Sequence, residues 1–183
     1  VHFFMALIDP RNRLIDYLRV SVTDRCNLSC TYCKPPGRLK VLPHRDILQY
    51  EEVHRLISVA VPLGISHVRI TGGEPLVRRG VVPFIASLRN ISGIEDISVT
   101  TNGVLLEEMA SGLRDAGISR LNISLDSLDP KRFAEITGSD AWHKVWRGIE
   151  AAERCGFDPI KINVVPVKGV NDDEVVAFSR LTV

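Results

Sequence analysis

The sequence predicts an α/β fold, in which parallel strands and outer helices form a partial barrel of about five βα units. Two observations support this fold. Short runs rich in valine and isoleucine alternate with longer helical runs, and every expected strand carries polar residues at alternate positions. Repeated βα units imply a parallel sheet with right-handed crossovers. Because five units leave the last strand without its next neighbour, we expect the barrel to be incomplete.

Five short runs bounded by Gly, Asp, Asn or Pro are expected to be the strands. In chain order they are Leu18–Thr23, Val68–Thr71, Ile97–Asn102, Leu121–Asp126 and Ile160–Val165.

Apolar residues at helical spacing predict the helices between these strands. Three stripes are each followed by a glycine that can end a helix: Val53–Ala60 before Gly64, Leu106–Leu113 before Gly117, and Val145–Ala152 before Gly156. Val81–Arg89 is expected to be a shorter helix. Asp172–Leu181 is expected to be the last helix, with Asn171 or Asp172 as its N-cap.

The expected strands are apolar on one face and polar on the other, because side chains alternate between faces. In the first strand Arg19 and Ser21 point one way, and Leu18 and Val20 point the other. A doubly wound sheet with helices on both faces would be apolar throughout. We therefore expect a barrel-like sheet with a polar lumen that is wet or holds a ligand, since an unpaired buried polar group costs roughly 1–3 kcal/mol. The alternative is an open sheet with one solvated face.

The composition of the 183 residues fits one globular domain, with 45% hydrophobic and 25% charged residues. A formal net charge of +1 gives no overall electrostatic case for binding nucleic acid or an anionic membrane. No apolar run is long enough to span a bilayer, and no signal peptide is recognisable. We therefore expect a cytoplasmic protein whose four cysteines are metal ligands or free thiols rather than disulfide bridges.

Three of these cysteines lie together directly after the first expected strand. Cys26, Cys30 and Cys33 have C-x₃-C-x₂-C spacing, which lets their sulfurs converge on one iron–sulfur cluster. A [4Fe–4S] cluster normally takes four thiolates, so three leave one iron open to another ligand. A zinc loop is the alternative, with His44 as its candidate fourth ligand. Cys155 lies far along the chain and is interpreted as a free thiol, without an assigned role.

The cysteine spacing, with an aromatic residue before the last cysteine, resembles the radical S-adenosylmethionine (radical SAM) superfamily. Gly72–Pro75, which follows the second expected strand, is similar to the glycine-rich motif of that superfamily. The resemblance implies one [4Fe–4S] cluster held by Cys26, Cys30 and Cys33. Its open iron would bind S-adenosylmethionine (SAM), which the reduced cluster cleaves to a 5′-deoxyadenosyl radical.

The sequence resembles more narrowly the molybdenum cofactor biosynthesis protein A family, the GTP 3′,8-cyclases. The segments that carry this likeness are Leu18–Cys26, Val68–Leu76, Thr100–Leu106, Leu121–Asp129, Lys161–Val165 and Gly169–Glu174. We therefore divide the chain into an N-terminal extension, residues 1–15, and an incomplete radical SAM core, residues 16–183. The resemblance covers only the N-terminal, SAM-binding part of the family.

The resemblance also implies roles for individual residues. Contacts with SAM would come from Tyr32 through its backbone, Gly73 and Ser124, and contacts with GTP from Arg19, Arg69, Thr100 and Lys161. GTP would lose its 3′ hydrogen to the radical, and the ribose carbon would attack C8 of guanine, giving (8S)-3′,8-cyclo-7,8-dihydroguanosine 5′-triphosphate. The three cations suit a triphosphate, because charged side chains make the strongest hydrogen bonds to phosphate.

The family's C-terminal region, which holds a second [4Fe–4S] cluster, has no counterpart in these 183 residues. We therefore expect the chain alone not to complete the cyclisation. The implied partners are GTP, an electron donor for the cluster and a downstream cyclic pyranopterin synthase, and a homodimer is left open. Two alternatives remain: another radical SAM enzyme, such as one that matures peptides or enzymes, and an iron–sulfur module without catalysis.

Overall fold

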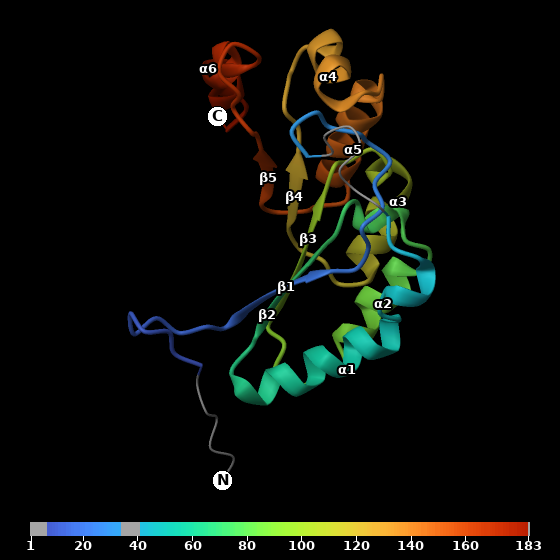
Figure 1. The fold of residues 1–183 in the computed structure, drawn as a ribbon, viewed down its shortest axis with the longest axis vertical. Helices are drawn as coiled ribbons and strands as arrows, with labels where there is room; N and C mark the ends of the chain where they lie inside the picture. The colour runs from blue at the N-terminus through green and yellow to red at the C-terminus, as the bar shows by residue number, and fades with distance from the viewer. Residues whose placement is uncertain (1–6, 34–40, 183) are drawn as a thin grey trace.

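The fold is built on one sheet of five parallel strands, seen in a computed structural model that describes residues 7–33 and 41–182 (Figure 1). The strands stand in chain order, each hydrogen-bonded to the next, and all pairs are parallel. Their bounds are β1 (Tyr17–Ser21), β2 (His67–Thr71), β3 (Asp96–Thr101), β4 (Leu121–Ser124) and β5 (Ile160–Asn163). Because β1 does not pair with β5, the sheet is not closed. The predicted partial barrel is confirmed.

Helices follow the strands and cover one face of the sheet. They are α1 (Tyr50–Ala60), α2 (Val81–Leu88), α3 (Leu106–Asp115), α4 (Pro130–Thr137), α5 (Trp142–Arg154) and α6 (Val175–Ser179). In Figure 1, α1, α2, α3 and α5 lie on the same side of the sheet. All crossovers on one side give a singly wound sheet, as in a barrel, rather than a doubly wound one. The short helix α4 was not predicted from the sequence.

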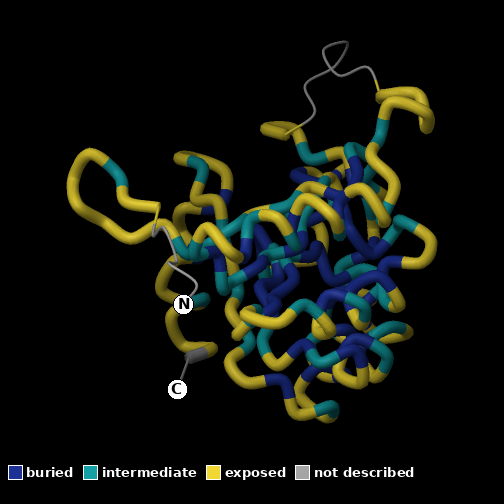
Figure 2. Tube along the Cα trace, turned by 90° about the horizontal axis from the view of Figure 1, so that it is seen from below, coloured by how far each residue is buried: buried dark blue, intermediate teal, exposed yellow. Residues whose placement is uncertain are grey.

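The hydrophobic core lies between the sheet and these helices. Val68, Ile70 and Val99 from the central strands are fully buried, as are Ile85 and Leu113 from the helices. Burial of each such side chain stabilises the fold by about 1.5–3 kcal/mol. Figure 2 shows the buried segments gathered inside one body, with exposed segments around them. The apolar faces predicted for the strands are therefore the faces that the helices cover.

β2 ends at Thr71 as predicted, and the other four strands end one or two residues earlier than the alternating pattern predicts. For β3 and β5 the reason lies in side-chain hydrogen bonds at the carboxyl end of the sheet. At Asn102 the backbone N–H donates to the Glu74 carboxylate, and at Val165 it donates to Asp126. A backbone group that bonds to a side chain no longer bonds to the neighbouring strand. The residues just beyond the strand ends therefore form loops around the edge where the site is expected.

The predicted C-terminal helix is only partly correct. The structure has a short α6 flanked by 3₁₀ turns at Asp172–Glu174 and Arg180–Thr182. Asn171 stands at the N-cap position of the first 3₁₀ turn but makes no side-chain capping bond, because its Nδ2 donates to the carbonyl oxygens of Asp126 and Val165. The Asn171 amide therefore holds this segment to the end of β4.

The described residues of the expected N-terminal extension form a small hairpin that projects from the sheet (Figure 1). Ile8 and Leu14 make an antiparallel bridge, and Asp9 accepts hydrogen bonds from the backbone of Arg11 and Arg13. Residues 1–6 of that extension lie outside the described residues. Within residues 7–33 and 41–182, no helix is long and apolar enough to cross a membrane.

Candidate functional site

The cysteine loop, residues 25–33, begins four residues beyond Ser21, the last residue of β1, at the carboxyl end of the sheet. Cys26 and Cys30 are partly buried and Cys33 is exposed. All four cysteines of the chain lie in its described part, and none of them forms a disulfide. Thiols at the open end of a parallel sheet are placed where α/β folds bind their ligands.

The loop is docked on the C-terminal end of α4. The backbone N–H groups of Ser29 and Thr31 donate to the carbonyl oxygens of Thr137 and Ile136, each at 2.9 Å. These carbonyls belong to the last turn of the helix, where they have no partner within the helix itself. The helix that the sequence analysis missed therefore fixes the backbone between the first and last cysteines.

Tyr32 ties the loop to the end of β4. Its hydroxyl donates to Asp126 Oδ2 at 2.6 Å, and the other oxygen of Asp126 accepts from Val165 N at 2.9 Å. Burial and the Asp126 carboxylate raise the pKa of Tyr32, so its hydroxyl stays protonated and remains a donor. The Tyr32 side chain thus fixes the loop to β4, although Tyr32 itself is an exposed residue.

The glycines after β2 pack directly against the start of the cysteine loop. Gly73 N donates to Thr23 O at 2.6 Å, and Glu74 N donates to Arg25 O at 2.7 Å. A Cβ atom on Gly73 would lie 2.4 Å from the Arg25 carbonyl oxygen, closer than real contacts allow. Glycine is therefore required here by the approach of two backbones, and the same approach brings Gly73 beside the cysteine loop.

Glu74 is a buried carboxylate within the glycine motif, and the sequence alone indicates no role for it. It is 1% exposed, and it accepts from Leu76 N and Thr101 Oγ1 through Oε1 and from Asn102 N through Oε2. Burial raises the pKa of Glu74, while the three donors act in the opposite direction. Glu74 joins the glycine loop to the end of β3.

Burial raises the pKa of the Cys30 thiol to about 11, and the negative charges of Asp126, Cys26 and Cys33 act in the same direction. The three thiols lie on one short loop, and the hydrogen bond from Tyr32 to Asp126 places that carboxylate beside it. Thiolates in such a site need a compensating positive charge, which a bound metal centre supplies. The donor set therefore fits an iron–sulfur cluster.

A single metal ion fits less well. Among the described residues, no group of three or more His, Cys, Asp or Glu side chains is gathered around one ion position. In an iron–sulfur cluster each thiolate bonds to a different iron, so the three sulfurs need not surround one ion position. His44, the candidate fourth zinc ligand, lines a pocket with Arg25 and Arg78 instead. The zinc alternative therefore gains no support from the geometry.

The cations predicted to bind GTP lie on the face of the sheet that the helices leave open. Arg19 of β1 and Arg69 of β2 are direct neighbours in the strand register. Arg69 and Lys161 also line one small cavity of about 10 Å³ with Asn122. Like charges side by side on adjacent strands destabilise a sheet unless an anion lies between them. The arrangement brings the three cations together and favours an anionic ligand.

Thr100 lies in the next row of the same face, in register with Asn122 of β4, which pairs in turn with Lys161. The Thr100 hydroxyl is buried and has no hydrogen-bond partner among the described residues. A buried unpaired hydroxyl is costly, and a bound ligand would satisfy it. Ser124 lies at the last position of β4, nearer the cysteine loop.

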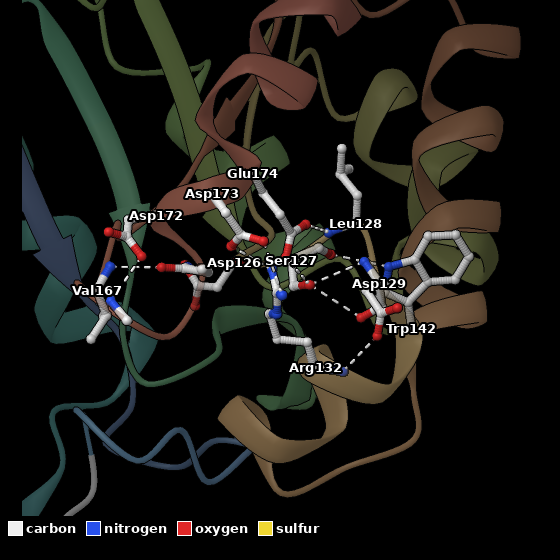
Figure 3. A network of polar contacts seen from close by, with 12 residues as sticks. Asp126, Ser127, Leu128, Asp129, Arg132, Trp142, Val167, Asp172, Asp173 and Glu174 are labelled. Atoms are coloured by element: carbon white, nitrogen blue, oxygen red, sulfur yellow. Dashed lines mark hydrogen bonds and ion pairs between the residues drawn. The ribbon is translucent and has the colours of Figure 1, made fainter.

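A second network, shown in Figure 3, braces the carboxyl end of β4 from the C-terminal segment. Glu174 accepts from Ser127 Oγ at 2.8 Å and from Leu128 N at 2.6 Å, and it pairs with Arg132 of α4. The network thus holds α4, on which the cysteine loop rests. The signal for this role in the sequence is weak, because acidic residues at a helix start are usually solvated.

Comparison with known families and proteins agrees with this geometry. The Radical SAM superfamily matches residues 20–182. Two curated relatives, both named GTP 3′,8-cyclase, come from Heliobacterium modesticaldum and Geobacter sulfurreducens. The first is 55% identical over 176 residues, covering 96% of this chain and 54% of the relative. The second is 54% identical over 179 residues, covering 98% and 55%. The chain spans about half the length of these relatives.

Solved structures show the same fold at low sequence identity. A structure of anSMEcpe with bound AdoMet has a TM-score of 0.72 at 21% identity, covering 91% of this chain and 48% of the other. Methylornithine synthase has a TM-score of 0.69 at 15% identity, covering 91% and 49%. The family match extends over most of the chain, and the cysteine loop, the glycine loop and the open sheet all lie within it. The chain therefore belongs to the radical SAM superfamily.

Proposed function

We propose that this chain is the SAM-binding part of a GTP 3′,8-cyclase, which carries out the radical step of molybdenum cofactor biosynthesis. The observation that carries the proposal is the contact between Gly73 and the Arg25 backbone. It brings the glycine motif against a three-cysteine loop in a chain more than half identical to GTP 3′,8-cyclases.

In this proposal Cys26, Cys30 and Cys33 hold one [4Fe–4S] cluster. When bound, the cluster supplies the electron that cleaves SAM to a 5′-deoxyadenosyl radical. The glycine loop and the cysteine loop are fixed to each other by the hydrogen bonds from Gly73 and Glu74. Gly73 and the backbone of Tyr32 would orient SAM at the open iron, and Ser124 would approach it from the end of β4.

GTP would lie against the open face of the sheet. Arg19, Arg69 and Lys161 would neutralise its triphosphate, and the unpaired hydroxyl of Thr100 would donate to it. The triphosphate would thus lie over the middle of the strands, and the reacting ribose would face the cysteine loop at their carboxyl ends. This orientation places the 3′ carbon next to the radical source, which positioning catalysis requires.

We also propose partners and a cellular location for the protein. An electron donor would reduce the cluster, and a cyclic pyranopterin synthase would take up the cyclised product. A homodimer remains compatible with the exposed edge strand β5. The reduced cysteines suit the cytoplasm.

The test is an oxygen-free assay of the reconstituted chain with SAM, GTP and a strong reductant. We expect 5′-deoxyadenosine to form, but the cyclised nucleotide to form far more slowly, because relatives carry about as much chain again. Absence of 5′-deoxyadenosine from a chain that contains iron and sulfide would refute the proposal. Cys155→Ala should retain the iron, whereas Cys30→Ala should lose it.

A further inference from the structure

Both the oxygen and the nitrogen of the Asn102 side-chain amide make hydrogen bonds, and one partner is a cysteine of the loop. Asn102 Oδ1 accepts from Val104 N at 3.1 Å. Asn102 Nδ2 donates to Asn27 Oδ1 at 2.7 Å and to Cys26 Sγ at 3.7 Å. Because Val104 supplies a donor, the amide oxygen must face it, and both N–H groups must face the cysteine loop. The orientation of the amide is therefore determined by its neighbours.

The backbone of Asn102 is also held in place. The residue is 9% exposed, and its backbone N–H donates to Glu74 Oε2 at 2.6 Å. Glu74 is in turn anchored to Thr101 Oγ1 and Leu76 N. A donor that is buried and fixed on both sides gives up little freedom when it bonds to sulfur.

We infer that Asn102 is a positioning residue for Cys26, which it holds toward the cluster while setting the cluster's reduction potential through an N–H to sulfur hydrogen bond. This inference rests on the proposed function, because it requires Cys26 to be a cluster ligand. Hydrogen bonds to the sulfurs of an iron–sulfur cluster are among the factors that set its potential. The bond stabilises the reduced state more than the oxidised state, because the reduced cluster carries more negative charge. Asn102 would therefore make the cluster easier to reduce.

The variant Asn102→Asp tests this role with almost no change of shape. An aspartate keeps an oxygen for Val104 N, loses both donors to the loop and adds a negative charge beside Cys26. Asn90→Asp makes the same change of charge at an exposed residue before β3, at the opposite end of that strand. Asn102→Ala removes the donors without adding charge.

The measurement is a redox titration of each reconstituted chain followed by electron paramagnetic resonance, with iron and sulfide content and far-ultraviolet circular dichroism on the same samples. We expect the potential to become more negative in Asn102→Ala and more negative still in Asn102→Asp, while Asn90→Asp matches the unaltered chain. Loss of the cluster from both Asn102 variants with the fold retained would equally support the positioning of Cys26.

Two other outcomes separate this inference from the proposed function. If both Asn102 variants keep the cluster at the potential of Asn90→Asp, the inference is overturned and the proposed function stands. If Cys26→Ala retains full iron and an unchanged spectrum, Cys26 is not a ligand. That result would refute both the inference and the proposed function. Should Asn102→Asp fail to fold, the potential of Asn102→Ala decides.

Discussion

Glu74 Oε2 accepts a hydrogen bond from the backbone N–H of Asn102 at 2.6 Å, which links the glycine loop after β2 to the end of β3. Each partner also contacts the cysteine loop: Glu74 N donates to Arg25 O, and Asn102 Nδ2 donates to Cys26 Sγ. Three loops from neighbouring βα units are thereby fixed to one another. The site is rigid at its base because a buried carboxylate joins them.

Glu74→Gln should destabilise the fold. The new amide would place a donor against Asn102 N–H, and a buried donor without an acceptor costs about 1–3 kcal/mol. The pKa of Glu74 is raised from its ordinary value of 4.5, so the carboxyl group stabilises the fold most at low pH and less as the pH rises through the raised value. Denaturation of both chains at several pH values should show the difference shrinking as the pH rises. A difference that widens would contradict the role of burial.

Gly73→Ala should disrupt the contact between the two loops. Its Cβ atom would meet backbone atoms of Arg25, which have little room to move, and such overpacking typically costs about 1–3 kcal/mol. Gly112→Ala in α3 is the matched control, because its nearest neighbour is a Val82 methyl group at 3.6 Å. That change should leave the protein as stable or stabilise it slightly. Thermal unfolding measures both, and equal effects would argue against the close approach at Gly73.

Tyr32→Phe should loosen the cysteine loop. It removes the 2.6 Å bond to Asp126, and since Tyr32 is 46% exposed we expect a loss of only about 1 kcal/mol. Tyr50→Phe is the control, because its hydroxyl makes only a 3.4 Å contact with the Arg78 carbonyl oxygen. Amide hydrogen exchange should show faster exchange at Ser29 and Thr31 in the first variant alone. Unchanged exchange there would mean that α4 suffices to hold the loop.

Replacing the cations of the open face should weaken GTP binding. Removal of Arg19, Arg69 or Lys161 would delete one charge-assisted contact with the proposed triphosphate, about 1.5–3 kcal/mol or roughly 10- to 150-fold in affinity. Arg45→Ala is the control, because its side chain is 86% exposed and belongs to a 3₁₀ turn outside the sheet. Calorimetric titration at constant salt compares them. Equal affinity in all four variants would contradict a triphosphate on this face.

The strands and most of the helices could be predicted from the sequence because each is encoded locally, and the assignment of the three cysteines as ligands likewise depends on local spacing. The period of two along Leu18–Ser21 and the spacing of the cysteines need no partner elsewhere in the chain. The helix α4 was missed because only Phe133 and Ile136 form its apolar stripe, although Asp129 before Pro130 is a helix-start signal. Its Asp129 side chain does accept from Arg132 N, as an N-cap should.

The positioning residues could not be predicted, because their roles depend on contacts between distant parts of the chain. Glu74 bonds to Thr101 and Asn102, and Tyr32 bonds to Asp126, which is 94 positions away. Gly73 was named as a SAM contact, but its close approach to the Arg25 backbone joins two loops that lie far apart in the chain. The register that sets Arg19 beside Arg69 is likewise a property of the assembled sheet.

The most direct test of the central claim is electron paramagnetic resonance of the reduced, reconstituted chain with and without SAM. In the proposed site the three cysteines would leave one iron open beside Gly73, so we predict that SAM changes the cluster signal and that Gly73→Ala weakens this change. A cluster signal that SAM leaves unaltered, at concentrations that saturate other members of the superfamily, would contradict the account.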